Sequence, residues 1–303
     1  MSQLHTLHEL AGAEQALIRS GAVLQTGMPS GVGLEKLVPG GVPVDKVTMV
    51  FADEGGFKTT LITQMQWAMA SVGPVVNVSL EDSAQLCAHR LLGRLSGVSF
   101  GRIHGGTLSP DERCRVGSAA LSEVMRNMHI VDDVEPRIER CFAAAKAVAG
   151  CRALFIDYIQ LLEGPYQKTT LDEALRACQR FAIQTKIAVV LVSQRKTIDM
   201  EGPRRDNPRP VSSDMFGSSS MRMCAKLAVG LFRPWSYCKV PTSVKGPYGP
   251  YAKWLSSAPD NIDIYPYLLE VHCTKNFAGP PGAYVVRVYP DTGIIEPFYL
   301  EFA

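Results

Sequence analysis

The segment "GGFKTT", from Gly55 to Thr60, has the residue types and spacing that bind phosphate. In a phosphate loop, a sharply turned backbone points several N–H groups at the phosphates, with a helix N-terminus behind them. A lysine then reaches the β- and γ-phosphates, and the hydroxyl of the next Ser or Thr binds Mg²⁺. Lys58 and Thr59 occupy these two positions, so the sequence predicts a site for ATP and Mg²⁺. The residues expected to bind the nucleotide are Gly55, Gly56, Phe57, Lys58, Thr59 and Thr60.

Phe57 departs from the full pattern of such a loop, G-x-x-x-x-G-K-[ST], because it stands where the second glycine belongs. A residue with a Cβ does not take the backbone angles of glycine freely. We therefore expect the loop either to use a different turn or to bind phosphate less well. A glycine-rich turn that carries an exposed lysine and no ligand is the simpler alternative.

Three further polar side chains directly follow apolar runs. Asp157 ends "LFID", where a carboxylate can orient the water shell of a metal ion. Glu81 follows "NVSL" and can polarise an attacking water, and Gln194 ends "VVLVSQ", where an amide can contact a γ-phosphate. Each has a simpler reading; Glu81, for example, can be an acid favoured at a helix start that Ser83 or Asp82 caps. Their shared position after strands favours a single site.

These side chains depend on strands that alternate with helices. Continuous apolar runs are found at 47–52, 74–80, 152–158, 187–193 and 227–232. Such runs are typical of a parallel sheet that is covered on both faces, and the alternation indicates an α/β domain. Ligands of open parallel sheets bind at the carboxyl ends of the strands, and the candidate residues lie at those ends.

Helix starts and C-terminal strands complete the expected elements. "SPDE" at 109–112 and "TLDE" at 170–173 are capping boxes that predict helix starts, and 83–95 has helical spacing of apolar residues. Toward the C-terminus, "YLLEVHCTK", "AYVVRVYPDTG" and "IIEPFYLEF" predict antiparallel hairpins at the sheet edge, with a turn at 291–293.

The composition is that of an ordinary globular chain. Of the 303 residues 46% are hydrophobic, and the net charge of +2 provides no overall basic field for nucleic acid. The eight cysteines include no C-x-x-C pair, so we expect reduced thiols. No signal peptide or membrane span is evident, and we expect a cytoplasmic protein without membrane contact.

The order and spacing of these segments resemble the RecA-like motor domain of the DnaB family of replicative helicases. "TGMPSGVGLEKL" is similar to the family's T-G-x-P-T-G-F-x-x-L-D, and "SLEDS" to its S-L-E-M-S. "FIDYIQLL" resembles its Walker B block, "SSDMFGSSSMRMCA" its D-L-R-E-S-G-S-I-E-Q-D-A, and "TKNFAGPPGA" its K-Q-R-N-G-P-T-G. The similarity runs from about residue 24 to residue 300.

This resemblance implies a RecA-like P-loop NTPase core, an α/β fold with a mostly parallel sheet flanked by helices. It implies Lys58 and Thr59 on phosphate and Mg²⁺, and Glu81 as catalytic base. It also implies Asp157 as the Walker B carboxylate and Gln194 as γ-phosphate sensor. The family forms ring hexamers with ATP between subunits and single-stranded DNA in the pore; a primase or a loader is a further implied partner. We expect the motor domain over 26–303 and, within 1–25, a helix that either docks on a neighbouring subunit or packs on its own chain.

Other departures from the family bear on activity. An alignment without gaps puts Phe277 in the position of the arginine finger, which leaves Lys275 and, near it, Arg287 as cations. Gly217 and Lys226 stand where the family usually has acidic residues. Without the finger we expect slow ATP hydrolysis, unless Lys275 of the next subunit compensates.

Two segments are candidates for nucleic-acid contact. The segment 195–209 has five basic and three acidic residues and corresponds to the family's pore loop. The DNA-binding candidates are Lys196, Arg204, Arg205 and Arg209. A basic and aromatic insertion at about 233–267 is expected as well, with four cations, no acids and five aromatics in 233–254. Its aromatics can stack on bases, cover a neighbouring subunit or pack on the nucleotide base.

Together these observations favour an ATP-dependent DNA helicase or translocase. The alternative is a ring or filament protein that binds DNA and hydrolyses ATP weakly or not at all, such as a recombination or loading factor. Phe57 and Phe277 favour the alternative, whereas Glu81 and Asp157 favour the motor.

Overall fold

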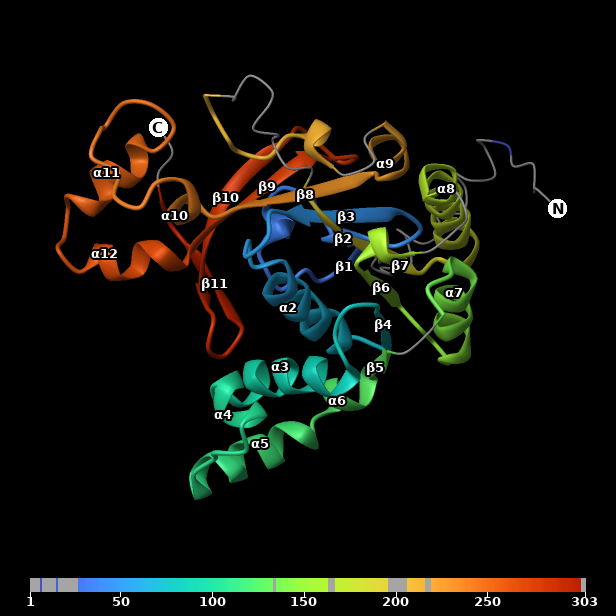
Figure 1. The fold of residues 1–303 in the computed structure, drawn as a ribbon. Helices are drawn as coiled ribbons and strands as arrows, with labels where there is room; N and C mark the ends of the chain where they lie inside the picture. The colour runs from blue at the N-terminus through green and yellow to red at the C-terminus, as the bar shows by residue number, and fades with distance from the viewer. Residues whose placement is uncertain are drawn as a thin grey trace.

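A mostly parallel sheet forms the centre of the molecule (Figure 1). In this computed structural model the described residues are 6, 15, 27–132, 135–162, 167–195, 206–215 and 219–300. Within them the sheet has nine strands in the order β11-β10-β9-β8-β3-β7-β6-β4-β5. The helix expected within 1–25 lies outside the described residues, apart from residues 6 and 15.

Six strands are parallel: β3 (Val47–Ala52), β4 (Val75–Ser79), β5 (Met128–Val131), β6 (Ala153–Asp157), β7 (Ala188–Gln194) and β8 (Leu227–Phe232). The five predicted runs are confirmed, and two of them match to the residue. The strand β5 was not predicted from the sequence. Its four residues are only half-buried at the sheet edge, so their sequence lacks the continuous apolar character of the central strands.

The C-terminal strands β9 (Leu268–Lys275), β10 (Gly282–Tyr289) and β11 (Ile294–Phe298) continue the sheet as predicted. Each pairs antiparallel with the strand before it, and β9 joins the parallel part through β8. The short strands β1 (Gly27–Met28) and β2 (Val42–Pro43) form a separate antiparallel pair.

Helices cover both faces of the sheet. On one face α2 (Lys58–Ala70) packs on alternate residues of the strands, such as Val50 and Val190. On the other face α7 (Ile138–Ala147), α8 (Gln167–Thr185) and α9 (Ser219–Cys224) pack on the intervening residues, such as Met49 and Leu191. The sheet is therefore buried on both sides, which is why its strands read as unbroken apolar runs.

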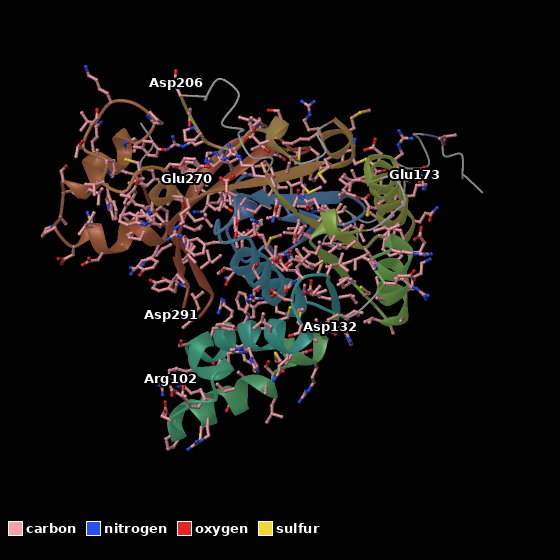
Figure 2. The ribbon with its side chains drawn as sticks, in the orientation of Figure 1. Arg102, Asp132, Glu173, Asp206, Glu270 and Asp291 are labelled. Carbon is pink, nitrogen blue, oxygen red and sulfur yellow. The ribbon has the colours of Figure 1, made fainter. Side chains whose placement is uncertain are left out.

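A helical arm stands below the sheet in Figure 1. It consists of α3 (Ala84–Ser96), α4 (Phe100–His104), α5 (Pro110–Ala120) and α6 (Glu123–Asn127). Arg102 lies on this arm, far from Glu270 in the antiparallel strands (Figure 2). Among the described residues, no helix has both the length and the apolar character needed to span a membrane.

One of the two capping boxes is confirmed. Ser109 Oγ accepts from the Glu112 N–H at 3.2 Å, and Glu112 Oε2 accepts from the Ser109 N–H at 2.8 Å. The second was wrong as a helix start, because α8 begins at Gln167 and Thr170 lies inside its first turn.

The chain between β8 and β9 forms a small subdomain at the left of Figure 1. It contains α10 (Pro234–Tyr237), α11 (Gly249–Leu255), α12 (Asn261–Ile264) and the 3₁₀ turn η4 (Tyr265–Tyr267). The other 3₁₀ turns are η1 (Leu34–Lys36), η2 (Ile159–Leu161) and η3 (Ser212–Asp214). All eight cysteines are free thiols, and four of them are buried.

Candidate nucleotide site

The strand ends that carry the candidate residues lie along one edge of the sheet. β3, β7, β6 and β4 are consecutive neighbours. Ala52 at the end of β3 pairs with Gln194 at the end of β7, and Ser79 at the end of β4 pairs with Asp157 at the end of β6. The structure thus brings Lys58, Glu81, Asp157 and Gln194 to one edge, as expected for a ligand site of a parallel sheet.

The loop between β3 and α2 contains two residues in the left-handed conformation, Gly55 and Phe57. Gly55 has φ 67°, and a Cβ at Gly56 would lie 2.9 Å from both the Ala52 Cβ and the Asp53 carbonyl oxygen. Phe57 has φ 59° and ψ 26°, the left-handed conformation. Phe57 thus takes backbone angles that favour glycine, at a cost of about 1–2 kcal/mol.

Lys58 is the first residue of α2, and its ammonium is held over the loop. Nζ donates to the carbonyl oxygens of Ala52 at 3.2 Å and Asp53 at 2.9 Å. Burial lowers the pKa of Lys58, while the carboxylates of Asp157, Asp53 and Glu81 oppose that shift. The lysine thus lies among the acidic residues of the site, where a polyphosphate would balance the ammonium and a metal cation would balance the carboxylates.

Asp157 has the properties of a metal-binding carboxylate. It is 9% exposed, and burial, then the charges of Glu81 and Asp82, raise its pKa to about 7. No hydrogen bond to its side chain is made within the described part of the chain. A buried carboxylate costs free energy unless a partner compensates it, and a divalent cation can be that partner. Asp157 and the Thr59 hydroxyl are oxygen ligands of the kind that Mg²⁺ takes.

Glu81 is not needed to cap the helix that follows it. Ser83 caps α3 by accepting from the Leu86 N–H at 3.2 Å, and Asp82 forms an ion pair with Arg90. Glu81 is exposed, and no ion pair of its carboxylate occurs among the described residues. Of the two caps considered from the sequence, the structure selects Ser83.

Gln194 ends β7 with an exposed side chain at the same edge. The turn η2 supports this strand end, because Gln160 Nε2 donates to Ser193 Oγ at 2.8 Å. The exposed Gln194 side chain, on a strand end that Gln160 holds, is accessible to a ligand at this edge.

Comparison with known proteins decides the family. The family model of the DnaB-like helicase C terminal domain matches residues 27–285. This chain belongs to that family. The replicative DNA helicase DnaB of Haemophilus influenzae is 28% identical over 229 residues, which cover 70% of this chain and 47% of that protein. A probable plasmid replicative DNA helicase of Chlamydia psittaci is 26% identical over 174 residues, which cover 54% of this chain and 37% of that protein. The chain thus spans about half the length of the curated relatives or less.

Solved structures show the same fold. The ATPase domain of G40P has a TM-score of 0.79 and 19% identity, covering 98% of this chain and 100% of that domain. A DnaB-like replicative helicase, solved to study its interactions with primase, has a TM-score of 0.77 and 19% identity, covering 98% of this chain and 68% of the other. The predicted RecA-like fold is confirmed.

Lys275 of this DnaB-family chain lies at the opposite edge of the sheet from the phosphate loop. It pairs with Ala228 at the start of β8, whereas the loop follows the end of β3, which is parallel to β8. The six residues of β3 separate the two edges by about 20 Å. Arg287, expected near Lys275, instead pairs with Leu268 at the far end of β9, roughly 20 Å away along the strand. Lys275 therefore does not reach the phosphate loop of its own chain.

Phe277 is 42% exposed in the turn after β9, and the Lys46 ammonium lies 5.1 Å from its ring centre. The Lys275 ammonium donates to the carbonyl oxygen of Arg222. Its pKa is lowered, first by burial and then by the charge of Lys226.

The DNA-binding candidates Lys196, Arg204 and Arg205 lie outside the described residues. Arg209 is described, and its surroundings contradict its assignment as a cation on a mobile loop. Its Nε and Nη2 donate to Glu270 at 2.6 and 2.7 Å, and its guanidinium lies 5.4 Å from the Phe232 ring centre. Because Glu270 is 1% exposed, Arg209 neutralises a buried carboxylate and cannot leave it without large cost.

Most aromatics of 233–267 pack on one another and on the C-terminal strands. Tyr251 and Tyr265 are fully buried, with ring centres 5.4 Å apart, and Trp254 meets Phe298 edge-on at 5.3 Å. Tyr251 Oη donates to Glu270 at 2.8 Å. Of the roles considered from the sequence, base stacking is ruled out for the fully buried rings of Tyr251 and Tyr265.

Arg195 and Asp53 were not recognised from the sequence. The Arg195 guanidinium is fully buried and lies 2.7 Å from Asp214 and 3.2 Å from Asp53. Their positions in the sequence could have identified them, because Arg195 directly follows Gln194 and Asp53 is the first residue after β3.

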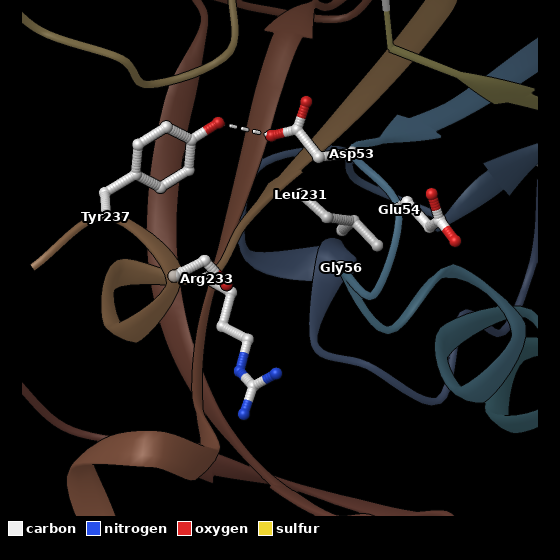
Figure 3. Close-up of a pocket in the computed structure, with 7 residues that line it drawn as sticks. Asp53, Glu54, Gly56, Leu231, Arg233 and Tyr237 are labelled. Carbon is white, nitrogen blue, oxygen red and sulfur yellow. Dashed lines mark hydrogen bonds between the residues drawn. The ribbon is translucent and has the colours of Figure 1, made fainter. Parts of the chain in front are cut away.

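A small pocket adjoins the phosphate loop (Figure 3). Tyr237 Oη donates to the Asp53 carboxylate at 2.5 Å across it. The residues that line it are Asp53, Glu54, Gly56, Leu231, Arg233, Ser236 and Tyr237.

Proposed function

We propose that this chain is the motor of an ATP-dependent replicative DNA helicase that translocates on single-stranded DNA. The observation that carries the proposal is the edge where Lys58, Glu81, Asp157 and Gln194 meet in a member of the DnaB family. The relatives at 26–28% identity are named replicative helicases, and the proposal extends their activity to this chain.

Each residue of the site has its own role in ATP hydrolysis. The amides of the loop and the Lys58 ammonium bind the β- and γ-phosphates, where they stabilise the charge of the transition state. Thr59 and Asp157 would hold Mg²⁺, which supplies further charge neutralisation at the phosphates. Glu81 polarises the attacking water, and Gln194 contacts the γ-phosphate at the end of β7.

The proposal includes a ring of identical subunits, with six as the expected number. Lys275 lies at the edge opposite its own loop, so a neighbouring loop is the site that it can reach. Single-stranded DNA is the proposed ligand of Lys196, Arg204 and Arg205, whose charges suit backbone phosphates. A primase is a proposed partner because one solved relative was studied for its interactions with primase, and a loader is a second.

The test is a comparison of Glu81→Gln with Glu139→Gln, a control at an exposed glutamate on α7. A motor loses turnover by about 10²–10⁴-fold in Glu81→Gln while it keeps ATP binding, because the water is no longer polarised. The control should hydrolyse ATP like the unaltered protein. Equal turnover in both variants would contradict the proposed role.

A DNA-binding ring or filament without a motor is the second candidate. The exposed Phe277, in the position of the family's arginine finger, is the observation that favours it. For such a protein, neither the unaltered chain nor Glu81→Gln would turn over ATP, and both would bind DNA equally.

A further inference from the structure

Arg233 lies beside the phosphate loop although the two are distant in sequence. β8 neighbours β3, Gly230 pairs with Phe51, and Arg233 directly follows β8. The Arg233 side chain is therefore delivered to the edge where the loop begins. Arg233 is one of the residues that line the pocket, together with Asp53, Glu54 and Gly56 (Figure 3).

The ring of Phe57 supports the Arg233 guanidinium. The guanidinium carbon lies 4.7 Å from the ring centre, and Nε donates to the Pro266 carbonyl oxygen at 3.0 Å. A cation over an aromatic face at this distance is attracted by the ring quadrupole. A glycine at position 57 has no such face, so the residue that alters the loop also creates this contact.

The guanidinium retains donors for a ligand. Its two terminal nitrogens have no hydrogen-bond partner within the described ranges, and Arg233 is the one cation among the described residues that line the pocket. Arginine stays charged and presents its donors as a planar fork that matches phosphate oxygens.

We propose that Arg233 is a phosphate-contacting residue that this chain supplies to its own nucleotide site, held over the loop by Phe57. The inference rests on the proposed function, since it requires that the loop binds ATP. This role explains why a phenylalanine stands in a left-handed position of the loop. The backbone of Phe57 is strained, but its ring positions a guanidinium that a glycine would not position.

The experiment is titration calorimetry of the full chain with Mg²⁺-ATP and, separately, with inorganic triphosphate. Arg233→Ala should weaken both by about tenfold, because a charge-assisted contact is lost. Phe57→Gly, which restores the usual glycine, should weaken binding rather than strengthen it. The double variant should bind no more weakly than Arg233→Ala, because the two residues act as one unit.

Two further variants at position 57 separate the ring from mere apolar packing. Phe57→Tyr retains an aromatic face and should bind like the unaltered protein, whereas Phe57→Leu should resemble Arg233→Ala. Tighter binding by Phe57→Gly, or unchanged binding by Arg233→Ala, would overturn the inference. A loss seen with ATP but not with triphosphate would overturn the phosphate contact.

Lys58→Ala distinguishes this failure from that of the proposed function. Suppose that Lys58→Ala loses ATP binding, whereas Arg233→Ala binds ATP as tightly as the unaltered protein. Then only the inference about Arg233 fails. If the unaltered protein does not bind ATP, both fail.

Discussion

The guanidinium of Arg195 lies 3.2 Å from the carboxylate of Asp53. Arg195 directly follows the candidate sensor Gln194, and Asp53 is the first residue of the phosphate loop. The ion pair therefore links the end of β7 to that loop. The same guanidinium donates to Asp214 at 2.7 Å and to the Pro208 carbonyl oxygen at 2.7 Å. One buried cation therefore ties three segments together beside the nucleotide site.

Removal of this cation should destabilise the protein strongly. Arg195→Ala removes the buried guanidinium that pairs with both Asp53 and Asp214 and should lower the free energy of unfolding by about 3–5 kcal/mol. Arg115→Ala is the matched control, because Arg115 pairs with Asp111 on the exposed surface of α5 and should cost no more than about 0.5 kcal/mol. Urea denaturation measures both; equal losses would contradict the account of Arg195.

Glu270 makes part of the stability depend on pH. Burial raises the pKa of Glu270, but hydrogen bonds from His272 and Arg209 more than offset this, and the net pKa is lowered. A carboxyl whose pKa is lowered in the folded state contributes stability above its unfolded pKa of about 4.3, which is lost as the pH falls through the folded value. Glu270→Gln should thus be less stable than the unaltered protein at pH 7, and the difference should shrink below about pH 4. A difference that stays constant with pH would contradict this assignment.

The three loop cations should control the salt dependence of DNA binding. Each backbone contact with single-stranded DNA contributes about 0.7 to the slope of log affinity against log salt. Replacement of Lys196, Arg204 and Arg205 by alanine should therefore reduce that slope by about 2. Arg113→Ala, on exposed α5, should leave it unchanged. Fluorescence anisotropy with a labelled oligonucleotide at several salt concentrations gives the slopes. A slope that the triple replacement leaves unchanged would show that the loop does not contact the DNA backbone.

Lys275 should act between subunits. Lys275→Ala alone should lose at least tenfold in ATP turnover, since a cation supplied in trans to developing phosphate charge is worth roughly 10³–10⁵ when it is an arginine. A mixture of Lys275→Ala with Lys58→Ala subunits should regain activity, because some interfaces then combine an intact Lys58 with an intact Lys275. No recovery on mixing, with assembly retained, would exclude action in trans.

The sequence was most informative where burial is uniform. β3 and β8 match the predicted ranges because strands buried on both faces consist of continuous apolar residues. β5, which is short and half-buried, carries no such pattern and was missed. The start of α8 was misjudged because its first turn precedes the residues that resemble a capping box.

The site itself was only partly predictable. Residues at strand ends were found because a parallel sheet brings its carboxyl ends together. The partner of Arg209 could not be found, since Glu270 lies 61 residues away and only the fold brings the two together. The left-handed conformation of Phe57, and the arginine above it, likewise depend on tertiary contacts that no local pattern encodes.

ATP hydrolysis by the purified chain, with and without single-stranded DNA and beside Lys58→Ala, tests the central claim most directly. The account predicts Mg²⁺-dependent turnover that DNA stimulates and that Lys58→Ala abolishes. Absence of turnover in both proteins, with DNA binding retained, would contradict a motor and leave the DNA-binding ring as the function.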